Sequence, residues 1–186
     1  VMRGEETQVL GWLAGDPARR RGWRVLCLPG THAKWVAVAD GKIARFITAM
    51  TGELFALLKT HSVLRSPPTE GELAGEDMTA FSIGVMAAGD GSALASRLFS
   101  ARGRFLAGEL AAGGVESYLS GLLIGAEIGA LWEKVRGEGD SVDIIGDAAL
   151  ARLYAHALKL RKITARVTDG EAAALEGLKA IWWEAA

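Results

Sequence analysis

Two tight turns within one run of strand-forming residues constrain this chain more than any other feature. Trp23 to Leu28 is predicted as a strand that ends at the turn Pro29-Gly30, and Lys34 to Ala39 as a second strand. Asp40-Gly41 is a strong tight-hairpin signal, after which Lys42 to Thr48 returns as a third strand. The sequence therefore predicts three consecutive antiparallel strands.

The segments around these strands are predicted to be helices, with two more strands towards the end of the chain. The expected helices cover Glu5 to Ala14, Gly52 to Val63, segments near 71–89, 92–100 and 115–135, Ala148 to Leu160, and a last one through Trp182. The further elements are short strands at Val142 to Ile145 and Ile163 to Val167, and a capping box at Thr69 and Glu72. This order predicts an α/β fold: a ribonuclease-H-like (actin-like ATPase) domain whose mixed sheet joins three antiparallel strands to parallel crossovers and carries an inserted helical segment.

Charge and cysteine content argue against several classes of protein. The 186 residues carry 21 basic and 22 acidic side chains, so no electrostatic pattern favours a nucleic-acid partner. The longest apolar stretches, such as Leu122 to Ile124, are too short for a membrane span. Cys27 is the single cysteine and is expected to pack inside a strand, which fits a cytoplasmic protein. The three histidines lie far apart in the sequence, so no metal-ligating residues are predicted.

The turn between the first two expected strands is the first candidate binding site. In Pro29-Gly30-Thr31-His32-Ala33-Lys34, a tight turn with glycine would expose successive backbone N–H groups. Such a concavity binds anions, and a Thr hydroxyl and a Lys can add hydrogen bonds and charge. An ordinary hairpin whose glycine merely permits the turn explains the same residues, and composition alone favours that explanation.

The polar segment Val1 to Gln8 is a second candidate. Glu5 and Glu6, with Arg3 at a helix start, could hold a substrate or supply a general base. Acidic residues in a first turn also complement the helix dipole, and on chemistry alone this explanation is favoured.

Three further segments carry weaker signals. Thr51-Gly52-Glu53 opens an expected helix, where Thr51 could cap the helix or the helix start could bind an anion. Ile144-Ile-Gly-Asp147 ends a buried strand at a helix start, where ligands gather in open sheets, and a simple strand-to-helix turn explains it equally well. The small residues of Ser120 to Glu127 favour close helix packing over catalysis.

Together, these segments resemble the 2-dehydro-3-deoxygalactonokinase family. The matching segments are Arg3-Gly-Glu-Glu-Thr-Gln8, Leu28-Pro-Gly-Thr-His-Ala-Lys-Trp-Val36, Phe46-Ile-Thr-Ala-Met-Thr-Gly-Glu-Leu-Phe55 and Ser120-Gly-Leu-Leu-Ile-Gly-Ala-Glu127. The likeness continues through Ile144 to Gly146 and Leu150 to Leu158, so it covers nearly the whole chain in family order. Each segment alone is weakly specific, and the ordered set carries the resemblance.

The resemblance implies an ATP-dependent sugar-acid kinase of D-galactonate breakdown. Members of the family belong to the sugar kinase/heat-shock-protein/actin superfamily, with two ribonuclease-H-like domains around a cleft. They phosphorylate the terminal hydroxyl of 2-dehydro-3-deoxy-D-galactonate, with ATP and Mg2+ as the expected cofactors.

The resemblance also implies roles for individual residues. Gly30, Thr31 and His32 would lie in a phosphate hairpin facing the β/γ-phosphates, with Lys34 as a neighbouring support. Gly146 and Asp147 would lie in the adenosine-motif region, and Thr51-Gly52-Glu53 would open a helix near the nucleotide.

Two departures from the family pattern affect these expectations. The N-terminal half, with the first phosphate motif and much of the sugar-acid site, is absent. Residues 1–186 are therefore expected to be the C-terminal nucleotide-binding half, with a helical insertion at about 66–135, and to be inactive alone. The pattern also places an Asp directly before the segment that matches Val1-Met-Arg-Gly-Glu-Glu6. That absent Asp is the leading candidate for the base, with Glu5 or Glu6, beside Arg3, as substitutes.

Two other functions stay open on the sequence. One is a non-catalytic nucleotide- or sugar-acid-binding module on the same fold, and the other is a kinase for another sugar acid. The expected partners are the sugar acid and the protein's own N-terminal domain, with no membrane or nucleic acid, and a homo-oligomer is left open. Trp182-Trp183 could cap the core or form an interface, and core packing is favoured.

Overall fold

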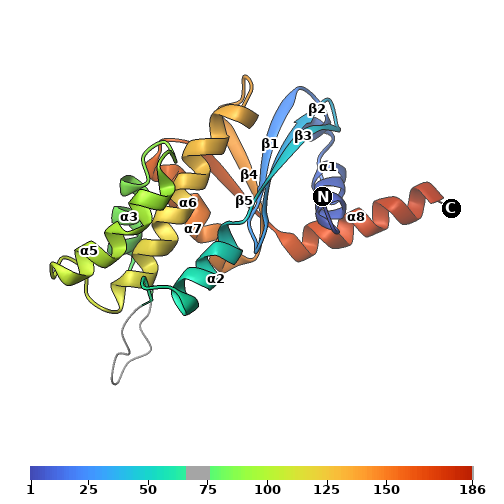
Figure 1. The fold of residues 1–186 in the computed structure, drawn as a ribbon. Helices are drawn as coiled ribbons and strands as arrows, with labels where there is room; N and C mark the ends of the chain where they lie inside the picture. The colour runs from blue at the N-terminus through green and yellow to red at the C-terminus, as the bar shows by residue number, and fades with distance from the viewer. Residues whose placement is uncertain (66–75, 186) are drawn as a thin grey trace. The chain divides into compact units, whose positions relative to one another are not determined.

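The computed structural model describes residues 1–65 and 76–185, which divide into two compact units. The first unit joins Val1–Ala49 to Glu133–Ala186, and the second is Met50–Trp132. The elements of the first unit are α1 (Glu5–Ala14), the 3-10 helix η1 (Pro17–Arg20), β1 (Trp23–Leu28), β2 (Ala33–Ala39), β3 (Lys42–Ala49), β4 (Ser141–Gly146), α7 (Ala148–Leu160), β5 (Thr164–Asp169) and α8 (Gly170–Ala185) (Figure 1). The second unit holds α2 (Thr51–His61), α3 (Met78–Ala87), α4 (Leu94–Leu98), α5 (Ser100–Leu106) and most of α6 (Gly114–Val135).

Five strands form one mixed sheet in the first unit, in the order β3-β2-β1-β4-β5. β1 pairs antiparallel with β2 and β2 with β3, whereas β4 is parallel to both β1 and β5. Asp40 (φ 47°) and Gly41 (φ 77°) form the β2–β3 turn with left-handed backbone, which Asp and Gly adopt at low cost. The tight hairpin predicted at Asp40-Gly41 and the α/β class are confirmed.

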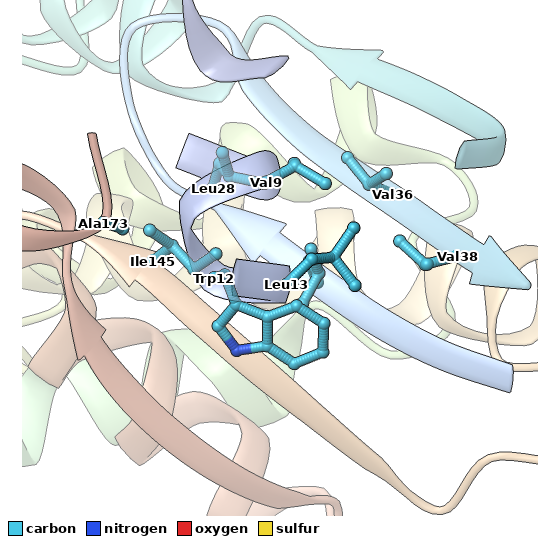
Figure 2. Packing of buried hydrophobic residues seen from close by; sticks show 9 residues of the cluster. Val9, Trp12, Leu13, Leu28, Val36, Val38, Ile145 and Ala173 are labelled. Carbon is cyan, nitrogen blue, oxygen red and sulfur yellow. The ribbon is translucent and has the colours of Figure 1, made fainter. Parts of the chain in front are cut away.

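The core of the first unit lies between α1 and one face of the sheet (Figure 2). Because side chains alternate along a strand, Leu26 and Leu28 of β1 join this core, while Cys27 between them is buried on the opposite face. The buried cluster consists of Val9, Trp12, Leu13, Leu26, Leu28, Val36, Val38, Ile145 and Ala173. The prediction that Cys27 packs as a small apolar residue inside a strand is confirmed.

Helices α1 and α8 approach each other until their backbones touch. A Cβ added at Gly11 would overlap the carbonyl oxygen of Ala173, and one added at Gly177 would overlap that of Thr7. Only glycine allows so close an approach, so these two positions fix how α8 crosses α1.

The opposite side of α8 is exposed, which corrects one expectation. Trp182 is 74% and Trp183 77% exposed, so the favoured core packing of this pair is wrong. Leu175 and Leu178 are also more than half exposed on the same helix. A periodic apolar pattern predicts a helix and its faces, but it does not say whether each face meets a partner.

The second unit is built from helices that pack closely through glycine. A Cβ at Gly84 of α3 would overlap Tyr118 O, and one at Gly121 of α6 would overlap Phe81 O. The close helix packing predicted for Ser120 to Glu127 is therefore confirmed. The expected helix near 71–89 is observed as α3, whose N-cap is Asp77, while its first residues and the Thr69–Glu72 capping box lie outside the described residues.

In the described ranges, every helix is too short or too polar to cross a membrane.

Candidate functional site

Three turns meet at one edge of the sheet in the first unit, where the parallel strands β1, β4 and β5 end. Pro29-Gly30 follows β1, Gly146-Asp147 closes β4, and Asp169-Gly170 closes β5. A Cβ at Gly146 would lie 3.5 Å from Pro29 Cδ, and one at Gly170 would lie 3.0 Å from Gly146 Cα. The three turns therefore touch. In open α/β sheets this edge is where ligands bind.

Gly30 has neither of the usual structural reasons to be glycine. Its φ is not positive, and no heavy atom outside its chain neighbours lies within 4 Å of the position a Cβ would take. An ordinary turn or tight packing therefore does not require glycine here. The adjoining Thr31 and His32 side chains are exposed, so bare backbone and two polar side chains face solvent together. This weakens the explanation of Pro29 to Lys34 as a plain hairpin.

Lys34 belongs to this turn but points inward. It is 3% exposed, and its Nζ lies 3.0 Å from Glu5 Oε1 and donates to His32 O at 2.7 Å. Lys34 is the second residue of β2 and Glu5 is the first of α1, so the ion pair joins the hairpin to the start of the helix.

The carboxylates at the start of α1 are engaged with backbone ahead of the helix. Glu5 Oε2 accepts from Arg3 N at 2.5 Å, and Glu6 Oε2 accepts from Gly4 N at 3.0 Å. Burial raises the pKa of Glu5, but the hydrogen bonds from Arg3 N and Lys34 and the charge of Lys34 outweigh it, so the pKa lies below its ordinary value. A carboxylate with a lowered pKa and two donors is a weak proton acceptor.

The other two turns are held by hydrogen bonds and include Asp169 and Gly170, which the sequence did not single out. Asp147 caps α7, with Oδ1 accepting from Ala149 N and Leu150 N at 3.0 and 3.2 Å. Asp169 Oδ1 accepts from Ala172 N at 2.8 Å at the start of α8. Gln8 Nε2 donates to Gly170 O at 3.1 Å, which ties α1 to the same edge. The sequence does contain a pattern that indicates Gly170, because β5 ends in Asp169-Gly170 just as β4 ends in Gly146-Asp147.

Thr51 and Gly52 lie in the second unit, whereas the other predicted site residues lie in the first. Thr51 is buried, and its hydroxyl donates to Glu127 Oε2 of α6, itself 6% exposed. The explanation of Thr51 as the helix cap is wrong, because Met50 holds the N-cap position of α2 and no side chain caps it. Gly52 is partly exposed in the first turn of α2.

Across residues 1–65 and 76–185, no three His, Cys, Asp or Glu side chains gather closely enough to hold a metal ion.

Comparison with known proteins gives one consistent result. Residues 1–181 match the model of a family described as 2-keto-3-deoxy-galactonokinase. The chain is 40% identical over 188 residues to a Rhizobium meliloti (strain 1021) protein named as a 2-dehydro-3-deoxygalactonokinase, DgoK1, and 33% identical over 183 residues to the 2-dehydro-3-deoxygalactonokinase of Escherichia coli (strain K12). These matches cover 98% and 97% of this chain but only 60% and 59% of the relatives, so the chain spans about three fifths of their length.

A solved structure matches over the same range. It is a crystal structure described as that of a 2-dehydro-3-deoxygalactonokinase protein from Sinorhizobium meliloti, with a TM-score of 0.84 and 39% identity. The match covers 97% of this chain and 59% of that one.

Proposed function

This chain belongs to the 2-keto-3-deoxy-galactonokinase family, and on that premise we propose that the protein containing it is an ATP-dependent kinase of 2-dehydro-3-deoxy-D-galactonate. The reaction transfers the γ-phosphoryl group of ATP to the terminal hydroxyl of the sugar acid, a step of D-galactonate catabolism. The observation that carries the proposal is the contact between the Pro29-Gly30, Gly146-Asp147 and Asp169-Gly170 turns at the ligand-binding edge of the sheet.

We assign the first unit to the ribonuclease-H-like, actin-like ATPase fold. The sheet order β3-β2-β1-β4-β5, with one antiparallel meander and two parallel crossovers, supports this assignment. Residues 1–186 then form the C-terminal nucleotide-binding half of the enzyme, with a helical insertion at about 66–135 that includes α3, α4, α5 and α6.

In this assignment the hairpin residues Gly30, Thr31 and His32 contact the β/γ-phosphates through backbone N–H groups and polar side chains. Gly146 and Asp147 lie at the adenosine end in this assignment, with Gly146 buried beside Pro29 and Asp147 exposed. Thr51 and Gly52 stay candidates through the backbone at the start of α2, because the Thr51 hydroxyl is already bonded to Glu127. Residues 1–65 and 76–185 hold no cluster of ligating side chains, so Mg2+ would enter with ATP and would supply neutralisation of charge on the transferring phosphoryl group.

The base of the reaction is assigned outside residues 1–186. Glu5 is paired with Lys34, and one oxygen of Glu6 accepts from Gly4 N, so both carboxylates already have partners at the start of α1. The family pattern has an Asp directly ahead of the segment matching Val1 to Glu6, and we take that Asp as the group that accepts the hydroxyl proton. The Arg3-Gly4 turn, fixed by Glu5 and Glu6, would then hold the chain next to the base.

The exposed side of α8 supports a second half of the protein as partner. One face of α8 packs on α1 through Ala173 and Gly177, while Leu175, Leu178 and Trp182 lie exposed. A helix that is apolar on both sides is normally buried on both sides. Because the relatives extend well beyond the matched range, we assign this face to contact with the N-terminal half.

The test is a coupled ADP-release assay of the full-length protein with a panel of 2-keto-3-deoxy sugar acids. We expect turnover that requires both ATP and 2-dehydro-3-deoxy-D-galactonate. Turnover only with a different sugar acid would assign another kinase specificity, and ATP binding without turnover on any of them would assign a non-catalytic binding module instead.

A further inference from the structure

We propose that Lys34 and Glu5 act as a positioning pair that holds the phosphate hairpin and the turn ahead of α1 in one fixed arrangement. The inference rests on the proposed kinase function. It gives Lys34 a role different from that of a phosphate ligand, and it gives Glu5 a role different from that of a base.

Lys34 is buried, and its charged group contacts partners inside the protein. The residue is 3% exposed, and its ammonium group meets Glu5 Oε1 at 3.0 Å and His32 O at 2.7 Å. A buried ammonium must be paired, and two of its three donors are used by these contacts. His32 O belongs to the hairpin itself, so Lys34 bonds to the loop whose backbone we assign to the phosphates.

The other end of the pair fixes the backbone before α1. The two oxygens of Glu5 divide between Lys34 Nζ and Arg3 N, the latter at 2.5 Å. The next residue of the turn, Gly4, has φ 112° and donates its N–H to Glu6 Oε2 at 3.0 Å. Arg3 N, Glu5, Lys34 and His32 O therefore form one continuous series of charge-assisted contacts from the turn to the hairpin.

This arrangement matters because the two connected segments have different tasks in the proposed reaction. The hairpin holds the phosphates, and the base lies just ahead of the turn. An error of about 1 Å between reacting groups can cost on the order of a hundredfold in rate. Loss of the pair should therefore lower kcat more than it weakens ATP binding.

The experiment uses the full-length protein with Lys34→Met, Glu5→Gln and the double variant, and Lys42→Met as the matched control. Lys42 is an exposed lysine at the start of β3 in the same sheet. We expect kcat to fall at least about tenfold in each variant, with KM for ATP changed less than about threefold, and the double variant to be no worse than the single ones. The control should match the parent.

Two results would overturn the proposal. If Lys34→Met greatly raises KM for ATP and leaves kcat unchanged, Lys34 binds phosphate directly. If Glu5→Gln leaves the kinetics unchanged, the ion pair has no role in catalysis. Glu5 is partly exposed, so Glu5→Gln carries the test if Lys34→Met does not fold.

A second readout separates this inference from the kinase assignment. Hydrogen–deuterium exchange should speed up in Glu5→Gln both in the residues 1–8 and in the residues 29–34, and in neither for Lys42→Met. An inactive parent protein would reject the kinase proposal, while this exchange pattern would still report on the pair. Faster exchange in only one of the two segments would contradict the coupling.

Discussion

Gly170 lies so close to Gly146 that a Cβ on Gly170 would come within 3.0 Å of the Gly146 Cα and 3.1 Å of Gln8 Nε2. Both glycines are buried at strand ends, Gly146 at the end of β4 and Gly170 directly after β5. The contact sets the spacing of two turns that we assign to the nucleotide site. Packing at this point and ligand binding are therefore expected to change together.

Gly170→Ala should destabilise the chain and weaken ATP binding. The new methyl group must displace backbone of Gly146 rather than a flexible side chain, which costs about 1–3 kcal/mol. Urea unfolding measures the stability, and calorimetric titration of the full-length protein with ATP measures the affinity. The control is Gly103→Ala in α5, where no atom lies within 4 Å of the added Cβ, so stability should rise slightly. Equal effects of the two substitutions would contradict the close contact.

Gly30→Ala should weaken ATP binding without destabilising the chain. The position is sterically open and its φ suits any residue, so the free energy of unfolding should stay within about 0.5 kcal/mol of the parent. A methyl group beside the phosphates should still raise KM for ATP roughly tenfold, or about 1.4 kcal/mol. Steady-state kinetics of the full-length protein at varied ATP measure KM, and thermal unfolding measures stability. An unchanged KM would remove Gly30 from the phosphate site.

Local chemistry explains which parts of this molecule could be predicted from the sequence. The Asp40-Gly41 turn and the bounds of α1 and α7 depend on residues adjacent in the chain, and the structure matches the predictions closely. The contact between Lys34 and Glu5, by contrast, joins two separate elements, and only the folded sheet brings them together. Gln8 and Gly170 are 162 residues apart, so no local pattern could have placed that hydrogen bond at the site.

The buried Thr51 hydroxyl is predicted to stabilise the second unit. Thr51→Val keeps the shape of the side chain but removes the hydroxyl that donates to Glu127 Oε2. This loss should lower the free energy of unfolding by about 1–3 kcal/mol. The matched control is Thr60→Val in the same helix, where an exposed hydroxyl donates to Ala56 O. Chemical unfolding of both variants should show a clear loss for Thr51→Val alone. Equal, small changes would mean that the buried contact adds nothing to stability.

The exposed face of α8 gives a prediction for the full-length protein. Leu178→Glu should lower its free energy of unfolding by about 1.5–3 kcal/mol, because we expect the leucine to be buried against the N-terminal half. Ala172→Glu, also exposed but in the first turn of the helix, is the control and should change stability little. Should the two variants unfold alike, the assignment of this face to the N-terminal half fails.

Two carboxylates should give stability profiles of opposite slope against pH. Asp143 of β4 is buried, and burial raises its pKa, partly offset by the charges of Arg166, Arg19 and Arg24, which line the same cavity of about 710 Å³. The Trp12 indole N–H also helps to lower this pKa, although it falls short of hydrogen-bond geometry and has no other partner in the described chain. The pKa of Glu5 is lowered instead, by Arg3 N and Lys34 acting against its burial.

The sign of each effect follows from which state holds the proton more tightly. Asp143 holds its proton more tightly in the folded state than in the unfolded state. Its contribution to stability is therefore full below the unfolded pKa of about 3.9 and is lost as pH rises through the folded pKa. Folded Glu5 holds its proton less tightly, so its contribution is present above about pH 4.3 and is lost as pH falls. Urea unfolding of Asp143→Asn, Glu5→Gln and the parent between about pH 3 and pH 7 tests both. Relative to the parent, Asp143→Asn should gain stability as pH rises and Glu5→Gln should lose it. Parallel curves for either variant would show that its carboxylate has the same pKa in the folded and unfolded states.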